Sequence, residues 1–144
     1  MNTLLEAKAI LPRIVELRRR IHAHPELGNH LPITTASVLA ELADLGLEIR
    51  KSKKSTSIVA TLHGAGPGPR ILLRGDMDAL PMDEESELPH RSTIPGAAHM
   101  CGHDAHTSML VGAARALSGI RDHLPCSVRF AFRFVGYVLA QIYD

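Results

Sequence analysis

The sequence has few of the residues that mark several large classes of protein. It has no tryptophan, only five other aromatic residues in 144, and two cysteines, Cys101 and Cys126. Two cysteines cannot build a disulfide framework, which is typical of a reducing compartment. The sequence contains no run of 18 apolar residues, so no membrane span is predicted. Glu6 and Lys8 interrupt the first apolar stretch, which argues against a signal peptide. We therefore expect a cytoplasmic protein.

The sequence also lacks an excess of charge of either sign. Sixteen basic and 15 acidic residues give a net charge of +1, so nothing indicates a nucleic-acid or membrane surface. The basic cluster 18–20 is expected on the solvated face of a helix. The 144 residues, 45% of them hydrophobic, suffice for one domain with a real core. All five aromatic residues lie between Phe130 and Tyr143, which is a marked shift in composition near the end of the chain.

Helices and strands are predicted to alternate along the chain. A first helix should end at His24, because the residue before Pro25 is pushed out of the α region, and Pro12 should lie in its first turn. A second helix should begin at a cap on Thr34 or Thr35 and end at a glycine. The remaining elements are extended runs at 47–53, 57–64 and 71–73 (the last a buried strand), a long loop at 81–100, a helix at 104–117 and a strand at 127–134. This alternation predicts an α/β layered domain.

Two carboxylates follow the apolar run 71–73. In extended chain residues i and i+2 project to the same side, so Asp76 and Asp78 should face one point. Neighbouring carboxylates repel each other unless a cation or a hydrogen-bond donor lies between them. The spacing therefore leaves two interpretations open, a pair of aspartates beside a cation or two turn-forming aspartates.

A denser cluster lies just before the third predicted helix. Residues 99–106 contain three histidines, a thiol and a carboxylate. Thiolate and imidazole are ligands that zinc and similar ions prefer, and the glycine at 102 should let Cys101 and His103 converge. Asp104 should cap the helix or hold a ring nitrogen of a ligating histidine. The alternatives are a hydrogen-bonded histidine cluster and thiol chemistry, with Cys101 as nucleophile and His103 or His106 as base.

These motifs together resemble a known family. The strings Leu72-Leu-Arg-Gly-Asp-Met-Asp-Ala-Leu-Pro81, Pro95-Gly96 and His99-Met-Cys-Gly-His-Asp-Ala-His106 resemble the hippurate hydrolase and indole-acetyl-amino-acid hydrolase branch of the dinuclear metallopeptidases, a group that includes aminoacylases and zinc carboxypeptidases. The earlier segment 17–28 also matches, so the resemblance covers about residues 10–132. It implies the N-terminal portion of a three-layer-like catalytic domain, with helices packed on a mixed sheet.

The resemblance also implies a chemistry. Members hydrolyse the amide bond of small N-acyl amino acids with two divalent cations, which can be zinc, manganese, cobalt or nickel, and which share an activated water. Cys101 and His103 match two metal ligands, and Asp78 matches the catalytic aspartate that orients the ligands. Candidates for an extra ligand, or for a residue that hydrogen-bonds a ligand, are Asp76, Asp104 and His106. By contrast, His22 and His24 are expected to be structural.

The chain departs from the family after the strand that 128–132 resembles. The family has its general base there in a Gln-Pro-Ala-Glu-Glu stretch, whereas no glutamate follows Glu87 in this sequence. Glu84 and Glu85 are expected in a solvated turn and do not replace it. The family's later ligands and its smaller lid and dimerisation domain have no match, although a homo-oligomer stays possible. We expect residues 1–144 to form a partial, metal-binding catalytic domain that is inactive alone. The alternative is a non-catalytic metal- or partner-binding remnant of that fold.

Overall fold

The computed structural model describes residues 3–134, which include the three phenylalanines of the aromatic segment near the end of the chain, whereas both tyrosines lie outside the described residues. The sheet has the strand order β1-β2-β4-β3; β1 and β4 pair antiparallel with β2, and β3 pairs parallel with β4. This mixed sheet with packed helices confirms the predicted α/β class. The elements are α1 (Thr3–Ala23), α2 (Pro32–Leu42), β1 (Glu48–Lys51), β2 (Ile58–Leu62), β3 (Ile71–Asp76), α3 (His103–Ser118), the 3-10 helix η1 (Arg121–His123) and β4 (Val128–Arg133).

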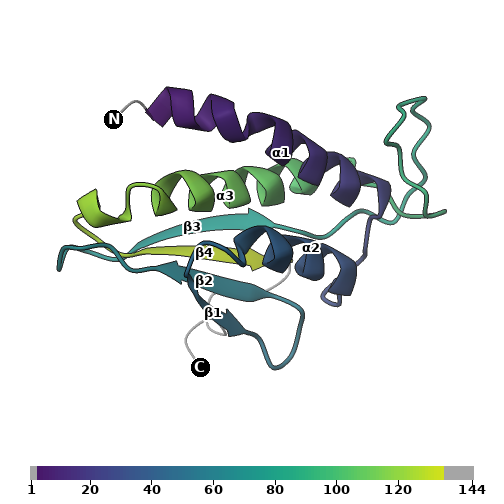
Figure 1. Cartoon of the computed structure of the whole chain (residues 1–144). Coiled ribbons are helices and arrows are strands. Elements are labelled where there is room, and N and C mark those ends of the chain that lie inside the picture. The colour runs from purple at the N-terminus through teal and green to yellow at the C-terminus, as the bar shows by residue number, and fades with distance from the viewer. Residues whose placement is uncertain (1–2, 135–144) are drawn as a thin grey trace.

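The helices are stacked on the sheet in layers (Figure 1). Helix α3 lies against β3 and β4, and α1 lies along the outer side of α3. Strand β4 is flanked by strands on both sides, so Phe130 and Phe132 are fully buried in the core. Leu17 of α1 and Val111 of α3 are also fully buried. Among the helices of residues 3–134, none is both long enough and apolar enough to cross a membrane.

Two predicted helix starts are wrong. Helix α1 begins at Thr3 and continues through Pro12, which lies in its interior and not in its first turn. Helix α2 begins at Pro32 and has no cap from Thr34 or Thr35. Its first N–H groups are instead bound by the carboxylate of Glu26, which accepts from the backbone nitrogens of residues 33 and 34 at 3.0 and 2.8 Å. The predicted end of the first helix before Pro25 is confirmed.

Strand β3 was predicted to be buried, and this is wrong for its first half. Within residues 3–134 the strand pairs only with β4, so Ile71 and Leu72 are 46% and 40% exposed. Its second half is covered by α3. A Cβ at Gly75 would lie 3.0 Å from the backbone oxygen of His106 and 3.1 Å from Cδ2 of Leu110. The glycine therefore permits the close approach of the first turns of α3 to the end of β3.

Candidate metal centre

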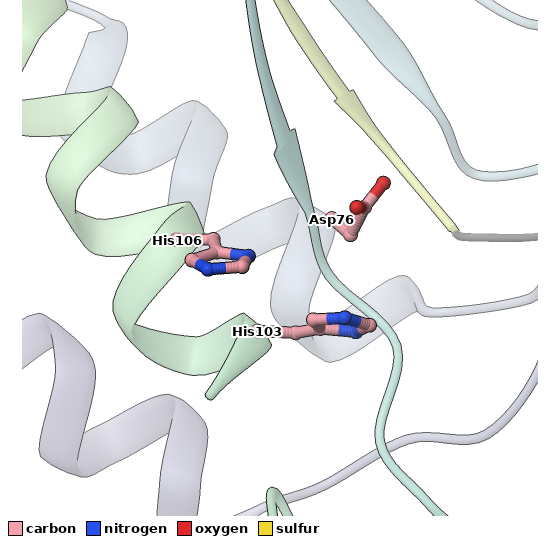
Figure 2. Close-up of side chains that lie close together, drawn as sticks. All are labelled: Asp76, His103 and His106. Atoms are coloured by element: carbon pink, nitrogen blue, oxygen red, sulfur yellow. The ribbon is translucent and has the colours of Figure 1, made fainter. Parts of the chain in front are cut away.

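Three potential metal ligands meet where β3 ends and α3 begins. One ligand atom from each of Asp76, His103 and His106 lies within 4.8 Å of the other two. Figure 2 shows the aspartate at the end of the strand and both imidazole rings extending from the first turn of the helix. In the described part of the chain, no other set of three such side chains meets this distance. We call these residues the Asp76 group.

Local structure explains why the two histidines share a face. They are three residues apart at the start of α3, and residues at this spacing are neighbours on a helix surface. Gly102 precedes the helix with a φ of 88°, a left-handed conformation that favours glycine. Its carbonyl oxygen accepts from the backbone nitrogens of Ala105 and His106. The glycine at 102 thus turns the chain so that both rings point to the end of β3.

The ring of His103 is held by the chain that follows β3. Its Nδ1 donates to the backbone oxygen of Asp78 at 2.8 Å and lies 3.3 Å from the carboxylate oxygen Oδ1 of the same residue. Assigning the proton to Nδ1 on the basis of this bond leaves the lone pair on Nε2, the form in which imidazole binds metals. The contact supports the role of Asp78 in orienting a ligand, which stays a prediction.

The carboxylate of Asp76 already has a positively charged partner. Arg74 donates to it twice, from Nε to Oδ1 at 2.9 Å and from Nη2 to Oδ2 at 2.7 Å. This hydrogen bonding raises the pKa of the Arg74 guanidinium above its usual value. Each carboxylate oxygen has a second lone pair, so Asp76 can bind a cation while it keeps Arg74. A cation must nevertheless share the charge of Asp76 with the arginine.

The side chains that the structure brings together most closely are not the predicted set of Cys101, His103 and Asp78. Cys101 is a free, exposed thiol and does not belong to the Asp76 group. His106, to which the sequence assigned no definite role, does belong to it. The role of Cys101 as a metal ligand therefore stays a prediction, as does its use as a nucleophile.

The predicted helix cap at Asp104 is wrong, because two basic side chains of α1 bind its carboxylate. Helix α3 has no side-chain cap. Oδ2 of Asp104 accepts from Nδ1 of His22 at 2.7 Å and lies 2.6 Å from Nε of Arg18. The ring that Asp104 holds is thus His22 and not a member of the Asp76 group. A part for Asp104 in binding an ion stays a prediction.

Glu84 also lies elsewhere than predicted. Its side chain is 3% exposed and contacts Nε2 of His22 at 3.1 Å, so the predicted solvated turn is wrong for this residue. Burial alone would raise the pKa of Glu84, but hydrogen bonds from Ser86, from the Ser92 N–H and from His22 lower it to about 2. Nothing in the sequence spacing indicates this contact, because 62 residues separate the two side chains.

His99 is the least satisfied polar side chain beside this network. It is 4% exposed, and neither ring nitrogen has a hydrogen-bond partner among the described residues. Burial lowers the pKa of His99 to about 4, although the nearby carboxylate of Asp104 acts in the opposite direction. His99 is therefore neutral at neutral pH.

The chain is similar in sequence to metallopeptidases and amidohydrolases. The pattern of peptidase family M20/M25/M40 matches residues 72–134. An N-acyl-L-amino acid amidohydrolase of Geobacillus stearothermophilus is 42% identical over 83% of this chain and 32% of its own length. An IAA-amino acid hydrolase of Arabidopsis thaliana is 42% identical over 83% of this chain and 27% of its own length. The chain thus spans about a third of the length of the curated relatives that it matches.

A solved structure shows the same fold. The Bacillus subtilis protein YXEP, described as a dinuclear metal-binding peptidase of the M20 family, superimposes with a TM-score of 0.82 at 37% identity. The match covers 89% of this chain and 36% of that protein. The arrangement of helices on a mixed sheet is therefore that of part of an M20 peptidase.

Proposed function

Because this chain belongs to peptidase family M20/M25/M40, we propose that it holds a divalent cation used to hydrolyse the amide bond of N-acyl amino acids. The observation that carries the proposal is the meeting of Asp76, His103 and His106 at the end of β3. The relatives named above include an N-acyl-L-amino acid amidohydrolase and an IAA-amino acid hydrolase, which supports this substrate class.

The donor set fits such a cation. Catalytic zinc sites use at least three protein ligands, and imidazole with carboxylate suits zinc, manganese, cobalt and nickel. The Asp76 group offers three, and Cys101 is a further candidate two residues before His103. When bound, the cation would polarise the scissile carbonyl and lower the pKa of a water molecule, so that the water can lose a proton and attack the carbonyl carbon. His103 would hold it through Nε2, because Nδ1 is engaged by the backbone oxygen of Asp78.

We also propose that the 144-residue chain binds the cation without efficient turnover. Amide hydrolysis needs a general base that moves a proton from water to the leaving amine. Two carboxylates at the site are candidates for this base. That of Asp76 is bound by Arg74, and that of Asp78 lies against the His103 ring. Neither is free to act as the base in the described arrangement.

Calorimetric titration of the metal-stripped chain with Zn²⁺ and Mn²⁺ tests the binding. We expect one cation at high occupancy, and His103→Gln should weaken affinity by at least about tenfold, because it removes a ligand nitrogen. His63→Gln is the matched control, since His63 is exposed and its ring contacts the carboxylate of Glu48 at the surface. The proposal is wrong if the wild-type chain binds neither ion, or if the His103 variant binds as tightly as the control.

An assay on N-acetyl amino acids with saturating metal tests the second part. We expect release of acetate by the chain to stay at the rate of the metal-free buffer control. Turnover that disappears with a chelator would show that the described residues include a working base, and would refute the proposed lack of catalysis.

A further inference from the structure

His22, near the C-terminal end of α1, lies between two carboxylates from distant parts of the chain. Its Nδ1 lies 2.7 Å from Oδ2 of Asp104, and its Nε2 lies 3.1 Å from Oε1 of Glu84. The side chains of His22, Asp104 and Glu84 are 4%, 0% and 3% exposed. We call this buried arrangement the His22 bridge.

Hydrogen-bond chemistry determines where the protons of the bridge lie. An ionised carboxylate can only accept, so each ring nitrogen that faces one must donate. Arg18 lies 2.6 Å from the same oxygen of Asp104 and favours its ionised form. The N–H of Ser92 donates to Glu84 at 2.7 Å and does the same there. Both ring nitrogens of His22 therefore face carboxylate oxygens as hydrogen-bond donors, and the ring links the two buried carboxylates.

The carboxylate of Glu84 organises the loop that precedes α3. We define the 81–97 loop as the segment closed at its base by the paired hydrogen bonds between Leu80 and Ala98. Besides His22, Glu84 binds the hydroxyl of Ser86 and the backbone nitrogen of Ser92, both within this loop. Figure 1 shows the loop beside the C-terminal end of α1. The bridge thus attaches the loop to α1.

The other carboxylate fixes the start of α3. Asp104 directly follows His103, and its position is set by Arg18 and His22 of α1. The ring of His103 is in turn attached to the backbone oxygen of Asp78, which precedes the loop in the chain, whereas α3 follows it. A shift of the first turn of α3 away from α1 would therefore move the His103 ring relative to Asp76.

We propose that His22 is a positioning residue for the metal centre, which holds the first turn of α3 and the 81–97 loop against α1 so that His103 faces Asp76. This inference rests on the proposed function, because it requires His103 to bind a cation. Residues that orient metal ligands without touching the ion change metal affinity by about 10- to 100-fold. His22 should act in this way although it lies in a different helix from the ligands.

The test compares His22→Gln with His24→Gln in the full 144-residue chain. His24 is a matched control, because it is exposed at the same helix end and its ring is hydrogen-bonded to the carbonyl of Arg20 in that helix. Zn²⁺ affinity is measured by calorimetry at a temperature where circular dichroism shows both variants folded. We expect His22→Gln to lose about 10- to 100-fold in affinity and His24→Gln to stay within about twofold of wild type. A merely structural role would lower thermal stability and leave the affinity of the folded variant unchanged, which would overturn the inference.

A second variant keeps the test decisive if His22→Gln does not fold. Glu84→Gln removes one carboxylate and leaves Asp104 paired with Arg18, and Glu85→Gln is its exposed control. We expect Glu84→Gln alone to lower affinity. Where His22→Gln folds, the double variant should lose no more affinity than His22→Gln alone, because both residues act through one bridge. Independent, additive losses would contradict it.

Hydrogen exchange separates the failure of this inference from that of the proposed function. If the wild-type chain binds no Zn²⁺, the proposed function fails, and with it the positioning role. Exchange then decides whether the His22 bridge itself exists. We expect His22→Gln, but not His24→Gln, to lose amide protection in residues 83–97 and in the first turn of α3. Equal protection in both variants would show that His22 holds neither segment.

Discussion

The carboxylate of Asp76 shows at the scale of single residues how a donor can stand in for a cation. Two aspartates two residues apart predicted either a cation or a hydrogen-bond donor nearby, and the structure contains a donor to Asp76, Arg74. The side chain of Arg74 is 47% exposed, so solvent screens much of its charge. Arg74 therefore competes with a divalent ion for Asp76 without excluding it.

Replacing this arginine should strengthen metal binding. In Arg74→Gln the charge that opposes a cation is removed, and we expect Zn²⁺ affinity to rise by a factor of about two to five, the effect of an exposed ion pair. Calorimetric titration at low and high salt is the measurement, and Arg70→Gln, an exposed site just before β3, is the control. A weaker affinity in Arg74→Gln would indicate instead that the arginine holds Asp76 in the geometry of a ligand.

Contact between α3 and β3 is the feature that matters most at the scale of elements. The two elements come close enough for the Asp76 group to form because residue 75 has no side chain. Side chains from the first turn of a helix and from the last residue of a strand can share a site only if the two backbones approach closely. The glycine therefore serves the site as much as the packing.

A methyl group at this position should separate the two elements. For Gly75→Ala we expect a loss of about 1–3 kcal/mol in the free energy of unfolding, the usual cost of overpacking, together with weaker Zn²⁺ binding. Urea unfolding and calorimetry measure the two effects. Gly112→Ala, in α3, is the control, since its Cβ would make only ordinary contact, 3.4 Å from Ile14. Stability equal to that of the control would mean that α3 does not lie as close to β3 as described.

The passage of α1 through Pro12 gives a second prediction for an element. Proline in a helix interior is about 3 kcal/mol less favourable than alanine. Pro12→Ala should therefore raise the free energy of unfolding by about 1–3 kcal/mol, part of the gain being offset by the greater freedom of the unfolded chain. Urea unfolding followed by circular dichroism measures it. An unchanged stability would favour the helix start at Pro12 that the sequence predicted.

The pH dependence of stability belongs to the whole molecule, because the network that buries His99 joins α1, the 81–97 loop and α3. An unfolded histidine binds its proton near pH 6.5, whereas burial lowers the pKa of His99 in the fold to about 4. Between these values the unfolded chain holds more protons than the folded one. Acid therefore favours unfolding in this range.

The free energy of unfolding of the metal-free chain should accordingly fall as the pH drops from about 6.5 towards about 4. His99→Gln should make this part of the profile flatter, while His63→Gln at an exposed site should leave it unchanged. Glu84 adds a separate loss below pH 4.5, since its folded pKa is about 2. Urea titrations at half-unit steps of pH measure the profile. The same slope in His99→Gln and wild type would show that His99 is not buried in its neutral form.

What the sequence by itself determined is what depends on neighbours along the chain. The spacing of apolar residues, the proline at 25 and the alternation in 127–134 set the α/β class and most of the element boundaries. The motif at residues 99–106, which contains His103 and His106, indicated the family. These features are local, because hydrogen bonds within a helix and the geometry of a turn are decided by a few adjacent residues.

Only the tertiary structure decided which side chains from distant segments meet. It placed Asp76 beside the two histidines, made β3 exposed along its first half, and joined His22 to carboxylates 62 and 82 residues away. No pattern along the sequence encodes these contacts. An ion pair forms where packing of whole elements brings opposite charges together and removes water from them, and that arrangement is a property of the assembled fold.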